Sequence, residues 1–174
     1  MVSAYCCQSW RISTWRTTGA WPFTCPPTVA ETLDMTRLKA PVVYLRLHGF
    51  PGQPFLYGDG PEHYTALGTD QVRQADFQGS MIFLEGCYGL EMAQAFLDAG
   101  AMAAVGCSVP TWGRSWRLGP SSQVGREWLR QIRAGLDASD ALGLALASVP
   151  DLYNDGWSVL GDRMARLIAP GDIA

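Results

Sequence analysis

The sequence predicts an α/β protein, a three-layer sandwich with a mostly parallel central sheet. Three apolar runs rich in β-forming residues, at 41–47, 81–86 and 101–109, are short enough to be strands. Segments with helical hydrophobic spacing follow the second and third runs. The runs also lack the polar alternation of half-exposed strands, which is typical of a parallel sheet covered on both faces.

The first 40 residues are rich in Trp, Thr and Cys and contain the chain breaker "CPP". A short strand is expected at about 4–9, and helical spacing of apolar residues predicts a helix at 29–38. We interpret 1–40 as an abbreviated N-terminal segment within a single domain that spans 1–174.

The first apolar run ends at the turn cluster "HGFPGQP", which places His48 at the carboxyl end of a strand. The polar, Gly-rich stretch 51–79 is expected to be loop with a short helix. Beyond the second run, the spacing of apolar residues predicts a helix at 91–99, ended by Gly100.

Two further amphipathic helices are expected after the third run. Ser139 is the predicted N-cap of the second of them. Their apolar faces carry Val124, Trp128, Leu129 and Ile132 in the first helix, and Leu142, Ala145, Leu146 and Val149 in the second.

Composition limits the classes of function. Of 174 residues, 48% are hydrophobic, which is enough for a core and argues against intrinsic disorder. The net charge of −3 and the lack of a basic stripe argue against a nucleic-acid partner. No apolar run approaches the roughly 18 residues of a membrane span, and no signal peptide is recognised, so we expect a cytoplasmic protein without a membrane partner.

The chain has five cysteines, an odd number, and no CxxC pair. Reduced thiols are therefore expected in place of a disulfide framework or structural zinc site. The acidic loop with Asp59 and Glu62 shows no ligand array for calcium, so we predict neither a metal nor a cofactor.

His48 and Cys87 carry the clearest functional signal, because each follows a predicted parallel strand. Ligand sites in such sheets lie beyond the carboxyl ends of the strands. A cysteine attacks a carbonyl carbon as the thiolate, and a neighbouring imidazole can take its proton. The backbone amides of Gly49 and Cys87 are candidate oxyanion donors. Taken singly, a cysteine beside glycines is more often a small core residue.

Arg46 and Glu85 precede this pair by two residues each, and thus lie on the same face of their strands. A buried carboxylate needs a partner. Two arrangements remain open: Glu85 forms an ion pair with Arg46, or it faces the substrate pocket and binds a cationic side chain.

An α/β-hydrolase is the competing enzyme class, since "LHGFPG" is similar to an oxyanion loop and "GCYG" to a nucleophile elbow. The G-x-S-x-G motif, however, requires glycine where Glu85 stands, and the base must follow the nucleophile. Both histidines, His48 and His63, precede Cys87. This class is therefore excluded.

Several stretches resemble the CHAT domain family, the caspase-like domains of bacteria. "VVYLRLHGF" and "MIFLEGCYG" resemble the strands that end in the catalytic His-Gly and Cys, in that order along the chain. "AQAFLDAGAMAAVGCSVPTW", "REWLRQIRAGLDASDALGLALASV" and "GWSVLGD" resemble the later helices and strands of the family. The likeness runs in order from about residue 42 to 168.

The resemblance implies a caspase-like fold and a cysteine endopeptidase with His48 as base and Cys87 as nucleophile. It also implies that Glu85 lines the substrate pocket. We expect Arg46 and Trp112 to contact the substrate, a protein or peptide, as well. An acid two residues before the nucleophile, as in metacaspases, implies cleavage after a basic P1 residue.

Two features depart from the family pattern. The N-terminal third is shorter, and the tryptophan after the third strand is displaced to Trp112. The chain also has no recognisable sensor module, so a regulatory protein partner or ligand is expected. The alternative function is a catalytically silent CHAT-like protein-interaction module.

Overall fold

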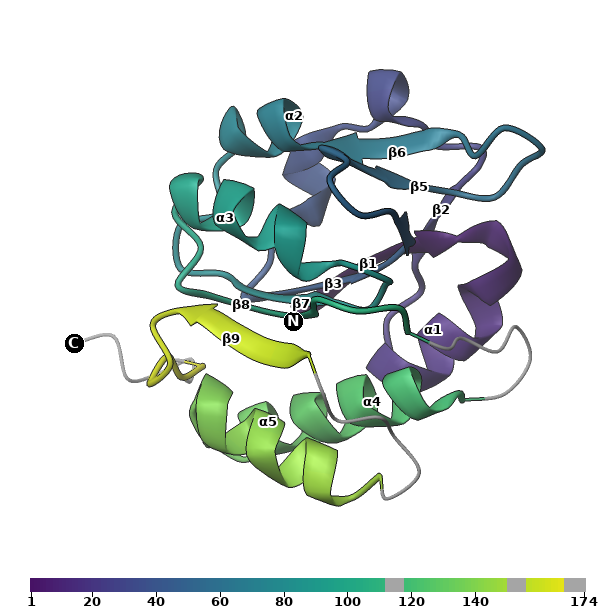
Figure 1. The fold of residues 1–174 in the computed structure, drawn as a ribbon. Coiled ribbons are helices and arrows are strands. Elements are labelled where there is room, and N and C mark those ends of the chain that lie inside the picture. Colours follow the sequence, from purple (N-terminus) through teal and green to yellow (C-terminus); the bar gives the residue numbers. More distant parts are fainter. Residues whose placement is uncertain (112–117, 150–155, 168–174) are drawn as a thin grey trace.

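Figure 1 shows the computed structural model of the chain, which describes residues 1–111, 118–149 and 156–167. The strands and α-helices in chain order are β1 (Val2–Cys7), α1 (Arg11–Thr18), β2 (Phe23–Cys25), β3 (Val42–Arg46), β4 (His48–Gly49), β5 (Phe55–Tyr57), β6 (Thr65–Gly68), α2 (Thr69–Arg73), β7 (Met81–Leu84), α3 (Leu90–Asp98), β8 (Ala103–Cys107), α4 (Pro120–Arg133), α5 (Ala138–Ala147) and β9 (Trp157–Gly161). Short 3-10 turns lie at Gln8–Trp10, Ala30–Thr32 and Met35–Leu38.

The described strands form two sheets. The larger has the order β2-β1-β3-β7-β8-β9, and its strands run parallel except for β9, which is antiparallel to β8. The smaller is an antiparallel sheet of β4, β5 and β6. The protein is therefore α/β with a mostly parallel central sheet, which confirms that part of the predicted fold class.

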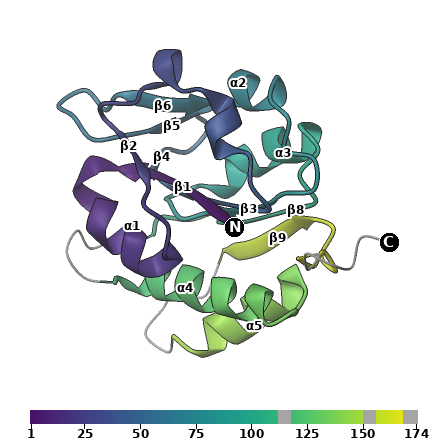
Figure 2. The same ribbon diagram turned by 180° about the vertical axis from the view of Figure 1, so that it is seen from behind.

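Structural elements cover both faces of the central sheet. Helices α1, α4 and α5 lie on one side, and α2, α3 and the small sheet lie on the other (Figures 1 and 2). Side chains alternate between two cores accordingly: Tyr44 and Phe83 pack towards Trp128 of α4, while Leu45 and Leu84 pack into the opposite core. This burial on both faces explains the nearly continuous apolar strands.

Strands β3 and β7 are neighbours in register, with Leu45 opposite Leu84. Because parallel strands end at the same sheet edge, the residues that follow each strand leave the sheet side by side. This pairing brings the segment that leads to His48 close to the segment that leads to Cys87.

The segment 29–38 differs from its prediction, because it forms two 3-10 turns and no α-helix. Leu33 between the turns has an extended backbone, with φ −72° and ψ 113°. The Asp34 side chain accepts a hydrogen bond from the Thr36 amide and caps the second turn. Local capping by this aspartate competes with a continuous helix.

The stretch 51–79, expected to be loop with a short helix, also contains β5 and β6 of the small sheet. The remaining differences are smaller. The first strand is Val2–Cys7, two residues earlier than expected, and the first 40 residues themselves supply the strands β1 and β2. Helix α5 is capped by Asp137, whose carboxylate accepts a hydrogen bond from the Asp140 amide, so the prediction of Ser139 as the cap is wrong. None of the helices in the described ranges is long and apolar enough to cross a membrane.

Candidate functional site

A pocket of about 150 Å³ opens at the carboxyl edge of β3 and β7. The candidate catalytic residues His48 and Cys87 line it, together with the buried Arg46 and Glu85. The full lining is Trp10, Arg46, Leu47, His48, Glu85, Gly86, Cys87 and Thr111.

Cys87 lies in the tight turn between β7 and α3, and its side chain is partly exposed at the pocket. The next residue, Tyr88, has a positive φ of 53°, which turns the chain sharply after the thiol. The Thr111 amide donates a hydrogen bond to Cys87 Sγ at 3.2 Å, and Sγ lies 3.5 Å from the Thr111 carbonyl oxygen. Among the described residues, the hydrogen-bond partners of this sulfur all belong to Thr111.

His48 reaches the pocket from β4, so the small sheet carries it. Its ring packs against Trp10, with 4.6 Å between ring centroids, and Nε2 lies 3.7 Å from Oδ1 of Asp59. Burial and the nearby His63 lower the pKa of His48, while Asp59 acts in the opposite direction. A lowered pKa keeps the imidazole neutral near pH 7, the state that a general base requires.

Two glycines allow the segments that carry His48 and Cys87 to approach each other. A Cβ at Gly49 would lie 2.0 Å from the carbonyl oxygen of Cys87, and a Cβ at Gly86 would lie 2.3 Å from that of Leu47. Neither position has room for a methyl group. The sequence "HG" and "GC" at the two strand ends is therefore required by close backbone packing.

Glu85 and Arg46 form an ion pair, the first of the two arrangements left open by the sequence. Nε of Arg46 lies 3.0 Å from Oε1 of Glu85, and the two side chains are only 1% and 3% exposed. The guanidinium also lies over the Trp10 ring, 4.9 Å from its centroid.

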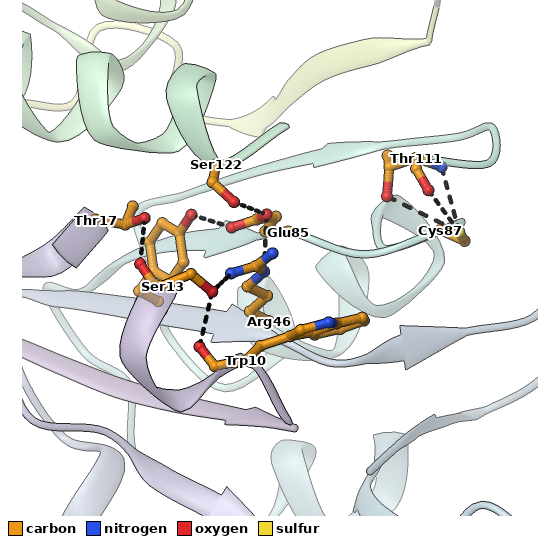
Figure 3. Close-up of polar contacts among 9 residues, drawn as sticks. Trp10, Ser13, Thr17, Arg46, Glu85, Cys87, Thr111 and Ser122 are labelled. Atoms are coloured by element: carbon orange, nitrogen blue, oxygen red, sulfur yellow. Dashed lines mark hydrogen bonds and ion pairs between the residues drawn. The ribbon is translucent and has the colours of Figure 1, made fainter. Parts of the chain in front are cut away.

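Further hydrogen bonds satisfy this buried pair (Figure 3). The Tyr44 hydroxyl donates to Oε2 of Glu85, and the Ser122 hydroxyl donates to Oε1 at 2.6 Å. Arg46 donates in turn to the Ser13 hydroxyl. Burial and the adjacent Glu85 raise the pKa of Tyr44, so this phenol stays protonated and can donate. Glu85 is thus held as the centre of a network that joins β3, β7 and α4.

Of the predicted site residues, His48, Cys87, Arg46 and Glu85 meet in one pocket, and Gly49 lies against it. Trp112 lies outside the described residues. The structure adds Thr111 and Asp59, which contact the thiol and the imidazole respectively. Neither residue directly follows β3 or β7, the two strands that lead to His48 and Cys87, so the strand-end pattern gave no signal for them.

Comparison of this chain with protein-family models and with curated proteins found no match. Membership of the CHAT domain family therefore stays a prediction from the sequence.

Proposed function

We propose that the chain is a caspase-like cysteine endopeptidase that uses His48 and Cys87. One observation carries the proposal: a partly exposed thiol and an imidazole of lowered pKa, each beyond one of two adjacent parallel strands, line the same pocket. The other four cysteines are buried. Cys87 is therefore the thiol that a substrate can reach.

In the proposed mechanism, His48 takes the proton of Cys87, and the thiolate attacks the peptide carbonyl carbon. The protonated imidazole then gives its proton to the leaving amine, which leaves a thioester on Cys87. Water activated by His48 hydrolyses the thioester and releases the second product. Asp59 near Nε2 orients the imidazole and stabilises its charged form.

The oxyanion formed in each step needs hydrogen-bond donors. The Cys87 amide makes no hydrogen bond with any described residue, so it is available for this role. Gly49 is the second proposed donor, and its contact with the Cys87 carbonyl fixes it beside the nucleophile. One such donor typically contributes about 100-fold or more in rate.

The hydrogen bonds of Cys87 Sγ to Thr111 describe a resting arrangement. Attack requires the sulfur to turn from Thr111 towards His48. Catalytic hydrogen bonds often tighten only when substrate binds. This arrangement agrees with an enzyme that a partner or the substrate itself activates.

A preference for basic P1 residues would require Glu85 to attract the substrate. Its carboxylate is already bound by Arg46, Tyr44 and Ser122. A P1 lysine or arginine would have to compete with these partners, so we propose at most a weak preference for a basic P1 residue.

Labelling with a peptidyl chloromethyl ketone tests the proposed function. We expect modification at Cys87, and in the His48→Ala variant we expect it to slow by about 100-fold or more, because general-base assistance is lost. Mass spectrometry of the labelled chain gives the site and the rate. Cys107, buried at the end of the adjacent β8, serves as the internal control. Equal labelling of Cys107 and Cys87 would favour the catalytically silent interaction module.

The charges around His48 predict two opposite shifts of its pKa. Asp59→Asn removes a carboxylate that raises this pKa, so the pKa should fall; His63→Ala removes a neighbour that lowers it, so the pKa should rise. NMR titration of the imidazole, in a Cys87→Ala background with a chelator present, measures both without coupling to the thiol. Shifts of the same sign in the two variants would contradict this arrangement of charges.

A further inference from the structure

We propose that Cys7, His48 and Asp59 form a binding site for a divalent transition-metal ion, with Zn²⁺ as the best match, and that the bound ion inhibits the enzyme by occupying His48. The inhibition depends on the proposed endopeptidase function. The binding of the ion does not.

The three side chains converge from separate parts of the fold. Cys7 ends β1, His48 lies in β4, and Asp59 follows β5 in the loop before β6. One ligand atom from each lies within 4.8 Å of the others, and His48 Nε2 lies 3.7 Å from Asp59 Oδ1. Metal–ligand bonds of about 2.0–2.3 Å in a tetrahedral site separate the ligand atoms by about 3.3–3.7 Å. The longest separation therefore has to close by at most about 1 Å.

The set of donors selects the metal. A thiolate with an imidazole and one carboxylate suits Zn²⁺ or Co²⁺, whereas Ca²⁺ and Mg²⁺ require mainly oxygen ligands. The Cys7 thiol is fully buried and lies 3.6 Å from the Tyr57 carbonyl oxygen. A thiol binds a metal ion as the thiolate, so the ion would replace the proton of Cys7. A bound ion would compensate the charge of the thiolate in this apolar position.

Outer contacts hold the carboxylate in place. The Ser9 amide donates to Oδ2 of Asp59 at 2.6 Å, and the Ser9 hydroxyl donates to Oδ1 at 3.1 Å. The Asp59 amide donates to the Cys25 carbonyl at 3.1 Å. Such contacts orient metal ligands. The exposed His63, whose ring centroid is 5.2 Å from that of His48, or a water molecule can complete the coordination.

Ion binding would affect the base directly. An imidazole whose Nε2 binds a cation is a weaker base at Nδ1, and the ion also replaces the interaction between His48 and Asp59. Both effects oppose transfer of the Cys87 proton. The ion would thus hold the enzyme in an inactive state until a chelating partner removes it.

Titration of the full chain with Co²⁺ tests the binding, because a thiolate ligand gives a sulfur-to-cobalt charge-transfer band. We expect this band, its displacement by Zn²⁺ and no competition by Ca²⁺. Cys7→Ala should abolish the band, and His48→Ala and Asp59→Asn should each weaken binding about 10-fold or more. Cys25→Ala, which removes the buried thiol opposite Cys7 on β2, and Cys87→Ala should both retain the band.

Each outcome bears on the proposal. No band in the wild-type chain, or a band that survives Cys7→Ala and disappears in Cys87→Ala, would overturn the site. Circular dichroism checks that Cys7→Ala is folded, and Asp59→Asn, at a partly exposed position, gives a second test if it is not.

Peptide-cleavage assays distinguish metal binding at this site from inhibition of the enzyme by the bound metal. Zn²⁺ should inhibit the wild-type enzyme, a chelator should restore it, and Cys7→Ala should retain cleavage while losing sensitivity to Zn²⁺. Equal inhibition of wild type and Cys7→Ala would overturn the inhibitory role. Normal Co²⁺ binding without any cleavage in the metal-free wild type would instead reject the endopeptidase function and leave the metal site intact.

Discussion

Replacing Cys87 with alanine is expected to reduce peptide cleavage at least about 1,000-fold, since no thioester can form without the sulfur. The fold should persist, because the side chain is small and partly exposed, and among the described residues its hydrogen-bond partners all belong to Thr111. Initial rates on a peptide library, measured without metal ions, check the loss. Thermal unfolding checks that the variant is folded.

Cys107→Ala is the matched control, because this thiol ends the neighbouring strand β8 but is buried. It should retain most of the activity. Cleavage that persists in Cys87→Ala and disappears in Cys107→Ala would show that the nucleophile is Cys107 and that its assignment to Cys87 is wrong.

Replacing Arg46 with methionine is expected to lower the free energy of unfolding by about 3–5 kcal/mol. The substitution keeps much of the side-chain volume but leaves the buried Glu85 carboxylate without its cation, and the cost of an uncompensated buried charge is of this size. Urea unfolding followed by circular dichroism measures the change. The double replacement Arg46→Met and Glu85→Leu should recover part of the loss, since no charge then remains buried.

Arg73→Met gives the surface comparison. Arg73 pairs with Asp98 at 3.1 Å, but both side chains are more than 40% exposed, so we expect a change below about 1 kcal/mol. If Arg46→Met cost no more than Arg73→Met, the buried pair would contribute little to stability and Glu85 would be free to take another role.

The sequence allowed the core of the fold to be predicted because its signals are local. The strands β3, β7 and β8 are continuous apolar runs, and α3 and α4 have regular helical spacing. Helix α1 has no such spacing, because it buries threonine and serine. Thr17 and Thr18 donate hydrogen bonds to backbone carbonyls one turn earlier, which satisfies their hydroxyl groups in the buried position. Because the buried residues are polar, the hydrophobic pattern of the sequence does not predict this helix. The sequence did not predict the small sheet, because its strands are short and segments rich in Gly and Pro separate them.

The candidate site also contains residues that the sequence could place and residues that it could not. The position of His48 and Cys87 in one pocket was predictable from the rule that ligands bind beyond parallel strand ends. The alternation of side chains predicted that Arg46 and Glu85 lie on the same faces of their strands. Cys7 and Asp59 meet only through the packing of the small sheet on the central sheet. Their spacing along the chain matches no metal-binding pattern, so this cluster could not be recognised from the sequence.

The proposed base and the proposed nucleophile belong to different sheets: His48 lies in the small antiparallel sheet, and Cys87 lies in the turn that follows β7 of the central sheet. The alignment of the imidazole with the thiol therefore depends on how the small sheet packs against the central sheet. Any change in how the small sheet packs against the central sheet would therefore change the distance between the two side chains.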